Sequence, residues 1–109
     1  MESEVMERGK VLVIGDRYTV NMFNLIGIKG IVVDDRDPKR IREIVQAYID
    51  SGDYAIIYIT KDLADLIKDY IERVSMIKKW PIITVIPSRW SETEEYDASA
   101  VLRKALGIG

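Results

Sequence analysis

Residues 10–16 of the chain read KVLVIGD. Their apolar side chains follow one another without the alternation of a half-exposed strand, so the pattern predicts a strand covered on both faces, as in a parallel sheet. Gly15 ends this strand, and Asp16 can cap the helix that we expect from about Arg17 to Ile26. Residues 54–59, YAIIYI, repeat the continuous apolar pattern and predict another strand of the same kind.

The rest of this region alternates between short apolar runs and amphipathic stretches. Asp37 followed by Pro38 marks a helix start, because the acid can cap the helix and Pro suits its first position, and Gly52 marks the end. A later helix is expected to carry one continuous apolar stripe of Leu63, Leu66, Ile67, Tyr70, Ile71, Val74 and Ile77. With strands at 30–33 and 82–86, the order predicts an α/β fold with a four-stranded, mostly parallel sheet and helices on both faces.

The two ends of the chain differ from this middle part. Residues 1–9 predict a loose polar tail, and residues 88–95 predict a polar linker before a short C-terminal helix that ends at Gly107. We therefore divide the chain into an N-terminal domain at 1–87 and a flexible linker with its helix at 88–109. A helix of about ten residues is not stable alone in water, so its apolar face must dock on its own domain or on a partner, and the pattern leaves both open. That face consists of Ala98, Val101, Leu102 and Ala105.

The composition excludes several kinds of chemistry. The 109 residues include no Cys and no His, which rules out disulfides, thiol nucleophiles, Ser-His-Asp triads and zinc sites built on these residues. The net charge of −2 is spread without a strong block of one sign, which argues against nucleic acid as a partner. No apolar run approaches the ~20 residues that span a bilayer, so we expect no direct membrane insertion and a cytoplasmic protein. The scarcity of Asn and Gln favours a thermophilic source.

The turn at Gly15 and Asp16 is the position where many α/β folds bind a ligand. The chain has neither G-x-G-x-x-G nor G-x-x-x-x-G-K, and an acid at this turn would repel phosphate. Helix capping is therefore the favoured role of Asp16, and contact with a partner, shared with Arg17, is the second. The acids in residues 34–37 (DDRD) suggest a metal site, but an Arg lies among them and a capped helix follows, which favours a solvated turn. We expect no catalytic residue, no cofactor and no metal site.

Two alternatives have the same order of elements. A receiver-like domain needs a phosphoacceptor Asp at the end of the third strand, whereas residues 57–60 read IYIT, and it needs a fifth core strand that the pattern does not predict. A stand-alone, small-ligand-binding α/β domain would show a polar pocket at the carboxyl ends of the strands.

Trp90 lies in the polar linker without apolar neighbours. It is either loosely packed on the domain or an interface anchor, a role in which Trp is enriched. The candidate partner interface therefore comprises Asp16, Arg17, Trp90, Val101, Leu102 and Ala105.

The order of several motifs resembles one protein family. Residues 13–27, VIGDRYTVNMFNLIG, resemble the opening of the F subunit of archaeal A-type and eukaryotic V-type ATPases, where a strand precedes G-D-x-x-T and F-x-L-x-G. Residues 56–64 resemble its apolar strand followed by T-x-D-L-A, and residues 81–87 resemble its P-x-I-x-x-I-P. Residues 102–108 are similar to its last helix. The resemblance covers nearly the whole chain.

The resemblance implies a non-catalytic subunit of the central rotor stalk of an A-type ATP synthase. Such a protein would bind the coiled-coil D subunit and turn inside the ring of catalytic A and B subunits. It would have a Rossmann-like N-terminal domain and a mobile C-terminal helix that modulates ATP hydrolysis and synthesis coupled to ion transport. It would lie in the cytoplasm, peripheral to the cell membrane through the complex.

Overall fold

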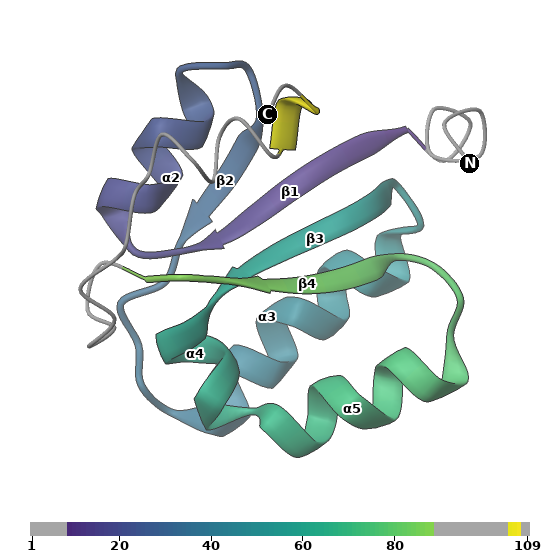
Figure 1. The fold of residues 1–109 in the computed structure, drawn as a ribbon. Helices are drawn as coiled ribbons and strands as arrows, with labels where there is room; N and C mark the ends of the chain where they lie inside the picture. Colours follow the sequence, from purple (N-terminus) through teal and green to yellow (C-terminus); the bar gives the residue numbers. More distant parts are fainter. Residues whose placement is uncertain (1–8, 89–104, 108–109) are drawn as a thin grey trace.

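Four parallel strands form the central sheet of the computed structural model, which describes residues 9–88 and 105–107 of the chain (Figure 1). The strand order is β2-β1-β3-β4, and each neighbouring pair is parallel. The strands are β1 (Lys10–Gly15), β2 (Lys29–Val32), β3 (Tyr54–Thr60) and β4 (Ile82–Ile86). The helices of the described region are α2 (Arg17–Asn24), α3 (Pro38–Ser51), α4 (Lys61–Leu66) and α5 (Lys68–Ile77). The predicted α/β, Rossmann-like architecture is confirmed.

The sheet has helices on both faces, as the continuous apolar strands predict. Figure 1 shows α2 on one face and α3, α4 and α5 on the other. Alternate side chains of each strand point to opposite faces, so a strand buried on both faces is apolar at every position. Leu12 and Ile14 belong to the larger core on the α3–α5 face, and Val13 between them belongs to the smaller core on the α2 face. The buried members of that smaller core are Val13, Val20, Phe23 and Ile86.

The helix boundaries follow the capping residues that the sequence indicates. Asp37 accepts a hydrogen bond from the backbone N–H of Lys39, and Pro38 occupies the first position of α3. Gly52, with φ of 73°, ends α3 in the left-handed region, where a Gly carries no steric penalty. Gly27 has φ of 82° and follows α2, which ends at Asn24, two residues before the predicted end at Ile26.

The predicted single helix with a stripe from Leu63 to Ile77 is wrong. The helical conformation is interrupted at Ile67, whose φ of −131° and ψ of 32° are not helical. As a result, α4 and α5 are separate helices. The break turns Ile67 into the larger core, where it is almost fully buried, while Leu66 is partly exposed and Ile77 is largely exposed. In one straight helix, all seven residues of the predicted stripe would have to lie on the face that packs on the sheet. The interruption instead lets each short helix pack on the sheet at its own angle.

The C-terminal residues that the structure describes lie against the α2 face. Ala105 and Leu106 are helical, and Gly107 has φ of 74°. Ala105 is partly buried and packs on the smaller core. Residues 89–95 of the predicted linker and most of the predicted final helix, including Trp90, Val101 and Leu102, lie outside the described residues. Ser88, the first residue of the predicted linker, is described and is fully buried.

Candidate functional site

The carboxyl edge of the sheet is where ligands bind in most open α/β folds, at the point where the strand order reverses. In this sheet the reversal lies between β1 and β3, because β1 pairs with β2 on one side and with β3 on the other. The helix after β1 is α2, and the helix after β3 is α4, so the chain leaves these neighbouring strands toward opposite faces (Figure 1). The residues at this point are therefore the first candidates for a site.

The reversal point is filled by a side chain of the protein itself. Thr60, the last residue of β3, is fully buried beside Gly15, the last residue of β1. A Cβ placed on Gly15 would lie 2.3 Å from Cγ2 of Thr60, far inside contact distance. Gly15 is thus needed for the close approach of Thr60, whereas a phosphate-binding fold uses such a Gly for the approach of the ligand.

Asp16 caps α2, as its position after β1 predicts. Its carboxylate accepts hydrogen bonds from the backbone N–H of Thr19 at 3.0 Å and from the Thr19 hydroxyl at 2.8 Å. The residue is only 9% exposed, so the carboxylate is committed to the helix and places negative charge where an anion would otherwise bind. Arg17, the next residue, is exposed. No contact tests the predicted partner role of either residue.

The acidic stretch before α3 also serves the local fold. Asp35 accepts a hydrogen bond from the backbone N–H of Asp37 at 2.9 Å, and Asp37 caps the helix. Arg36 forms an ion pair with Asp62 of α4 at 3.3 Å, which ties the loop before α3 to the end of β3. Within residues 9–88 and 105–107, no three His, Cys, Asp or Glu side chains are grouped so that they could hold a metal ion.

Two buried hydroxyls at the carboxyl edge were not anticipated from the sequence. Thr60 and Ser88 are both fully buried, and neither hydroxyl oxygen has a hydrogen-bond partner among the described residues. Thr60 is the last residue of β3, and Ser88 follows the adjacent strand β4, two residues after its end at Ile86. A hydroxyl becomes a nucleophile when a neighbouring base accepts its proton, and the described part of the chain provides no such base to either of them. Thr60 precedes α4 at its N-cap position, but its side chain makes no capping hydrogen bond. No sequence signal distinguishes such a buried, unpaired hydroxyl from one that caps a helix.

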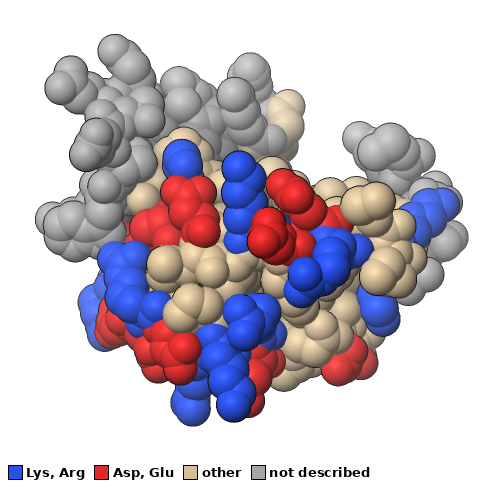
Figure 2. All heavy atoms as spheres, turned by 90° about the horizontal axis from the view of Figure 1, so that it is seen from below, with Lys and Arg blue, Asp and Glu red and all other residues tan. Residues whose placement is uncertain are grey.

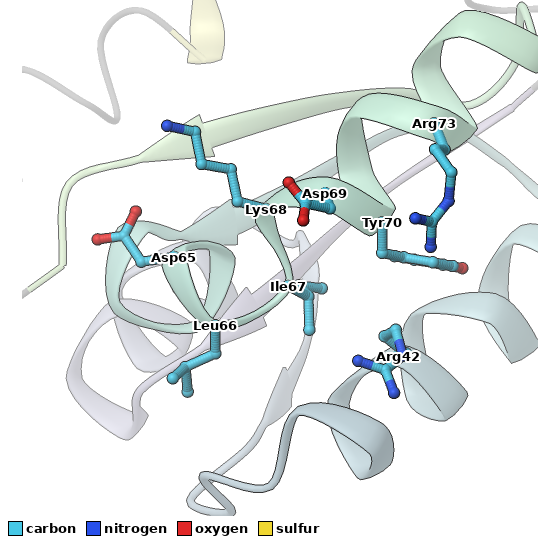
Figure 3. A pocket seen from close by; sticks show the side chains of 8 residues that line it. All are labelled: Arg42, Asp65, Leu66, Ile67, Lys68, Asp69, Tyr70 and Arg73. Carbon is cyan, nitrogen blue, oxygen red and sulfur yellow. The ribbon is translucent and has the colours of Figure 1, made fainter.

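A polar pocket of about 310 Å³ lies away from this edge, between α3 and the junction of α4 with α5 (Figure 3). Tyr70 donates a hydrogen bond to the side-chain oxygen of Gln46 on α3. Burial raises the pKa of the Tyr70 hydroxyl, the charge of Asp50 raises it further, and Arg42 acts in the opposite direction. The lining residues are Arg42, Asp65, Leu66, Ile67, Lys68, Asp69, Tyr70 and Arg73. Sequence reasoning missed this pocket because it treated α4 and α5 as one helix.

Comparison with known proteins identifies the family. Residues 11–104 match the family described as the ATP synthase (F/14-kDa) subunit. The chain belongs to this family.

Two relatives of this member of the ATP synthase (F/14-kDa) subunit family agree with that assignment. The F subunit of the A-type ATP synthase of Methanothermobacter thermautotrophicus is 30% identical over 101 residues, which cover 90% of this chain and 92% of that protein. The F subunit of the A-type ATP synthase of Methanocaldococcus jannaschii is 29% identical over 100 residues, covering 91% of this chain and 96% of that protein. The resemblance to the F subunit is therefore confirmed.

The first family motif has a structural explanation. In G-D-x-x-T, Gly15 admits Thr60, and Asp16 and Thr19 together cap α2. In F-x-L-x-G, Phe23 is buried and stacks on Tyr58 at 5.8 Å between ring centroids, and Gly27 takes the left-handed conformation. Leu25 is the exception, because it is 80% exposed and its side chain has no place in either core.

Other apolar residues of this family member are also exposed. Met76 is 85% exposed and Ile77 is 79% exposed, next to each other at the end of α5 and followed by Lys78 and Lys79. Figure 2 shows the protein from below, where basic and acidic side chains of the described residues are interspersed and no broad patch of one sign covers this face. None of the described helices is long and apolar enough to cross a membrane.

Proposed function

We propose that this protein is a non-catalytic subunit of the central rotor stalk of an A-type ATP synthase. It binds the coiled-coil D subunit, turns inside the ring of catalytic A and B subunits, and modulates ATP hydrolysis and synthesis coupled to ion transport. The observation that carries the proposal is the family match over residues 11–104, together with relatives named as F subunits of A-type ATP synthases that match along nearly their whole length.

The chemistry of the carboxyl edge supports a non-catalytic role. A nucleotide needs backbone amides at a helix N-terminus and a cation for its phosphates. Here Asp16 occupies the N-terminus of α2, and Thr60 fills the space beside Gly15. The buried hydroxyls of Thr60 and Ser88 lack a base among the described residues. The chain contains neither Cys nor His, the side chains that most often serve as a thiol nucleophile or as a general base.

The exposed apolar residues support a binding role for the N-terminal domain. Scattered apolar residues are common on protein surfaces, but large side chains that are almost fully exposed, next to each other and beside cations, are typical of contact surfaces. Met76 and Ile77 meet this description, and Leu25 is a motif residue without a place in the core. The N-terminal domain would make most of the contacts with the D subunit, and Met76 and Ile77 would be part of its contact surface.

The C-terminal residues suit regulation better than attachment. A helix that buries Val101, Leu102 and Ala105 contributes roughly a few kcal/mol before ordering costs, which can bias a rotor between states but cannot hold it under torque. Ala105 packs on its own domain, so contact with another subunit requires that it leave the α2 face. Two docking places with different stability in different rotational states would couple this helix to the position of the rotor. Arg17 and Trp90 are further proposed contacts.

The location follows from membership of the complex. A stalk subunit lies on the cytoplasmic side, peripheral to the cell membrane, without inserting into it. This location brings the contact surface within reach of other stalk and ring subunits.

A binding experiment with the D subunit tests the proposal. The full chain should form a stable one-to-one complex, and deletion of Ser99–Gly109 should leave this binding largely intact while changing the ATPase rate of the reconstituted complex. The double substitution Met76→Ser/Ile77→Ser should weaken the complex about tenfold or more. Both apolar side chains are exposed in the free protein and would be buried against the D subunit, and the variant would lose that gain in apolar burial. A full chain that binds no stalk subunit would overturn the proposal, and a deletion that abolishes binding would reverse the assigned roles.

A further inference from the structure

The two edges of the sheet differ in how they are protected against pairing with another strand. An edge strand turns backbone N–H and C=O groups outward, and natural proteins usually shorten such a strand or place a charge in it. The β2 edge follows this rule, because the strand has 4 residues and begins with Lys29 and Gly30. The β4 edge, on the opposite side of the sheet in Figure 1, has the sequence IITVI, without a charge, a Gly or a Pro. The β4 strand therefore lacks the features that prevent pairing.

No described residue pairs with the outer side of β4. The strand is hydrogen-bonded to β3 on its inner side, from the pair of Ile56 and Ile82 to the pair of Thr60 and Ile86. The backbone hydrogen bonds of turns and loops within residues 9–88 and 105–107 include none from residues 82–86. An incoming strand can therefore use the outward N–H and C=O groups of β4 as far as the described residues are concerned.

The side chains of β4 leave apolar surface exposed on both faces of the sheet. Ile83 packs on the larger core, so Val85, two residues later, lies on the same α3–α5 face. Ile86 belongs to the smaller core, which places Ile82 on the α2 face. Val85 is nevertheless 47% exposed and Ile82 is 38% exposed. A strand added beside β4 would cover both side chains, whereas a helix on one face would cover one of them, so the exposed surface favours an extended partner.

The sequence of β4 is complementary to a second copy of itself. In an antiparallel pair centred on Thr84, the two Thr84 residues lie opposite each other at a two-fold axis. The same register places Ile82 opposite Ile86 of the other copy, and Val85 opposite Ile83 of the other copy. Residues directly opposite each other share a face of the sheet and contact each other. Each exposed side chain of β4 would therefore be covered by an isoleucine.

The charges that flank β4 favour the antiparallel arrangement. Lys78 and Lys79 precede the strand, and the sequence after it contains Glu92, Glu94 and Glu95. In an antiparallel pair, the basic stretch enters the strand of one copy at the end where the chain of the other copy leaves toward its acidic stretch. A parallel pair would instead bring like charges to the same end, and opposite charges favour the encounter of two surfaces.

We propose that two copies of the free chain associate through antiparallel pairing of their β4 strands, which joins the two sheets into one continuous sheet. The contact between two short strands is small, so the dimer should be weak, with a dissociation constant on the order of 10–100 μM. The inference is independent of the proposed function. The helices of a coiled-coil partner satisfy their own backbone hydrogen bonds, so such a partner offers no strand to β4.

Sedimentation velocity of the full chain, at concentrations from about 5 μM to about 500 μM, tests the association. The average mass should rise from that of a monomer toward that of a dimer. Amide hydrogen exchange at the two ends of this range tests the site. The outward N–H groups of residues 82–86 should exchange several-fold more slowly at high concentration, and the N–H groups of β2 should not change. A monomer mass at every concentration would overturn the proposal.

A pair of charge variants tests whether β4 is the contact. Thr84→Lys would place two lysines opposite each other at the two-fold axis and should weaken self-association about fivefold or more, and Thr84→Glu should do the same. An equimolar mixture of the two variants should recover most of the loss, because a lysine then lies opposite a glutamate. Damage to the fold would not be reversed by mixing. Thr84 is partly exposed, and far-UV circular dichroism checks that each variant is folded.

A matched control adds the same charge outside the strand. Ser75 is exposed on α5, and Ser75→Lys should leave self-association unchanged. Self-association that survives both Thr84 variants would place the contact elsewhere on the chain, and a mixture that stays monomeric would reject the register centred on Thr84. Slow exchange of residues 82–86 at every concentration would show that another part of the same chain already pairs with β4, which would also overturn the proposal.

Discussion

The two faces of the sheet are covered very differently. Within residues 9–88 and 105–107, three helices on the α3–α5 face bury a dozen side chains in one core, whereas a single helix of 8 residues on the α2 face covers a core of four buried side chains. The apolar C-terminal residue Ala105 packs on the second face only. The comparison indicates that the α3–α5 face holds the domain together, and that the α2 face is the one on which contacts can be exchanged.

The largest expected effect compares the same substitution on the two faces. Ile57→Ala, in the central strand β3 on the α3–α5 face, should lower the free energy of unfolding by about 2–5 kcal/mol, the range for buried large-to-small changes. Ile86→Ala, in the edge strand β4 on the α2 face, should cost about 1–2 kcal/mol, because it is slightly accessible and its neighbours can close the gap. Urea unfolding at 25 °C measures both. Equal costs would remove the distinction between the faces.

A second substitution tests whether the carboxyl edge is rigid even on the thinly covered face. Gly15→Ala places a methyl group 2.3 Å from Cγ2 of Thr60, so it should destabilise the protein by about 1–3 kcal/mol through overpacking, as measured by urea unfolding. The double variant Gly15→Ala/Thr60→Ser removes the clashing methyl and should recover part of the loss. If Gly15→Ala alone were neutral, the reversal point would be loose enough to admit a ligand, and the proposed non-catalytic role would lose support.

The difference between local and long-range interactions explains what the sequence could and could not predict. The strands and the helix ends at Asp16, Asp37 and Gly52 were predicted correctly, because continuous apolarity and capping residues act locally. The break at Ile67 carries no Gly or Pro, and it depends on how α4 and α5 pack on the sheet. The pocket beside this interruption could therefore not be predicted from the sequence.

One feature of the carboxyl edge could be predicted from the sequence and another could not. The capping role of Asp16 follows from its place after an apolar strand, and the structure confirms it. The unpaired hydroxyls of Thr60 and Ser88 depend on which groups surround them in space, which a linear pattern does not contain. The same limit applies to Leu25 and Met76. Large apolar side chains are usually buried, so their exposure can be recognised only in the folded structure.

The cap of α2 gives a smaller effect. Asp16→Ala removes the acceptor of two hydrogen bonds from Thr19 and should lower the free energy of unfolding by about 1 kcal/mol, the usual cost of a lost N-cap. Asp16→Asn keeps an acceptor and should cost less, and chemical denaturation measures both. Binding of the two variants to the D subunit should follow their stability. A larger loss of binding for Asp16→Asn than for Asp16→Ala would contradict a purely structural role.

The smallest expected effect is the alkaline behaviour of Tyr58, which packs on the α2 face against Phe23. Burial raises the pKa of the Tyr58 hydroxyl above its usual value near 10. The unfolded chain therefore releases this proton at a lower pH than the folded chain does. The contribution of Tyr58 to stability is complete below about pH 10 and is lost as the pH rises through the higher pKa of the folded state.

Thermal unfolding midpoints between about pH 8 and pH 11 measure this loss, because the range brackets the usual tyrosine pKa. The midpoint of the wild-type protein should fall more steeply above about pH 10 than that of Tyr58→Phe, which has no proton to release. Since few of the described residues cover the α2 face, the difference in slope should be small. A slope for Tyr58→Phe equal to that of the wild type would mean that water reaches Tyr58 as freely in the folded chain as in the unfolded one, and that the α2 face is more open than its buried core indicates.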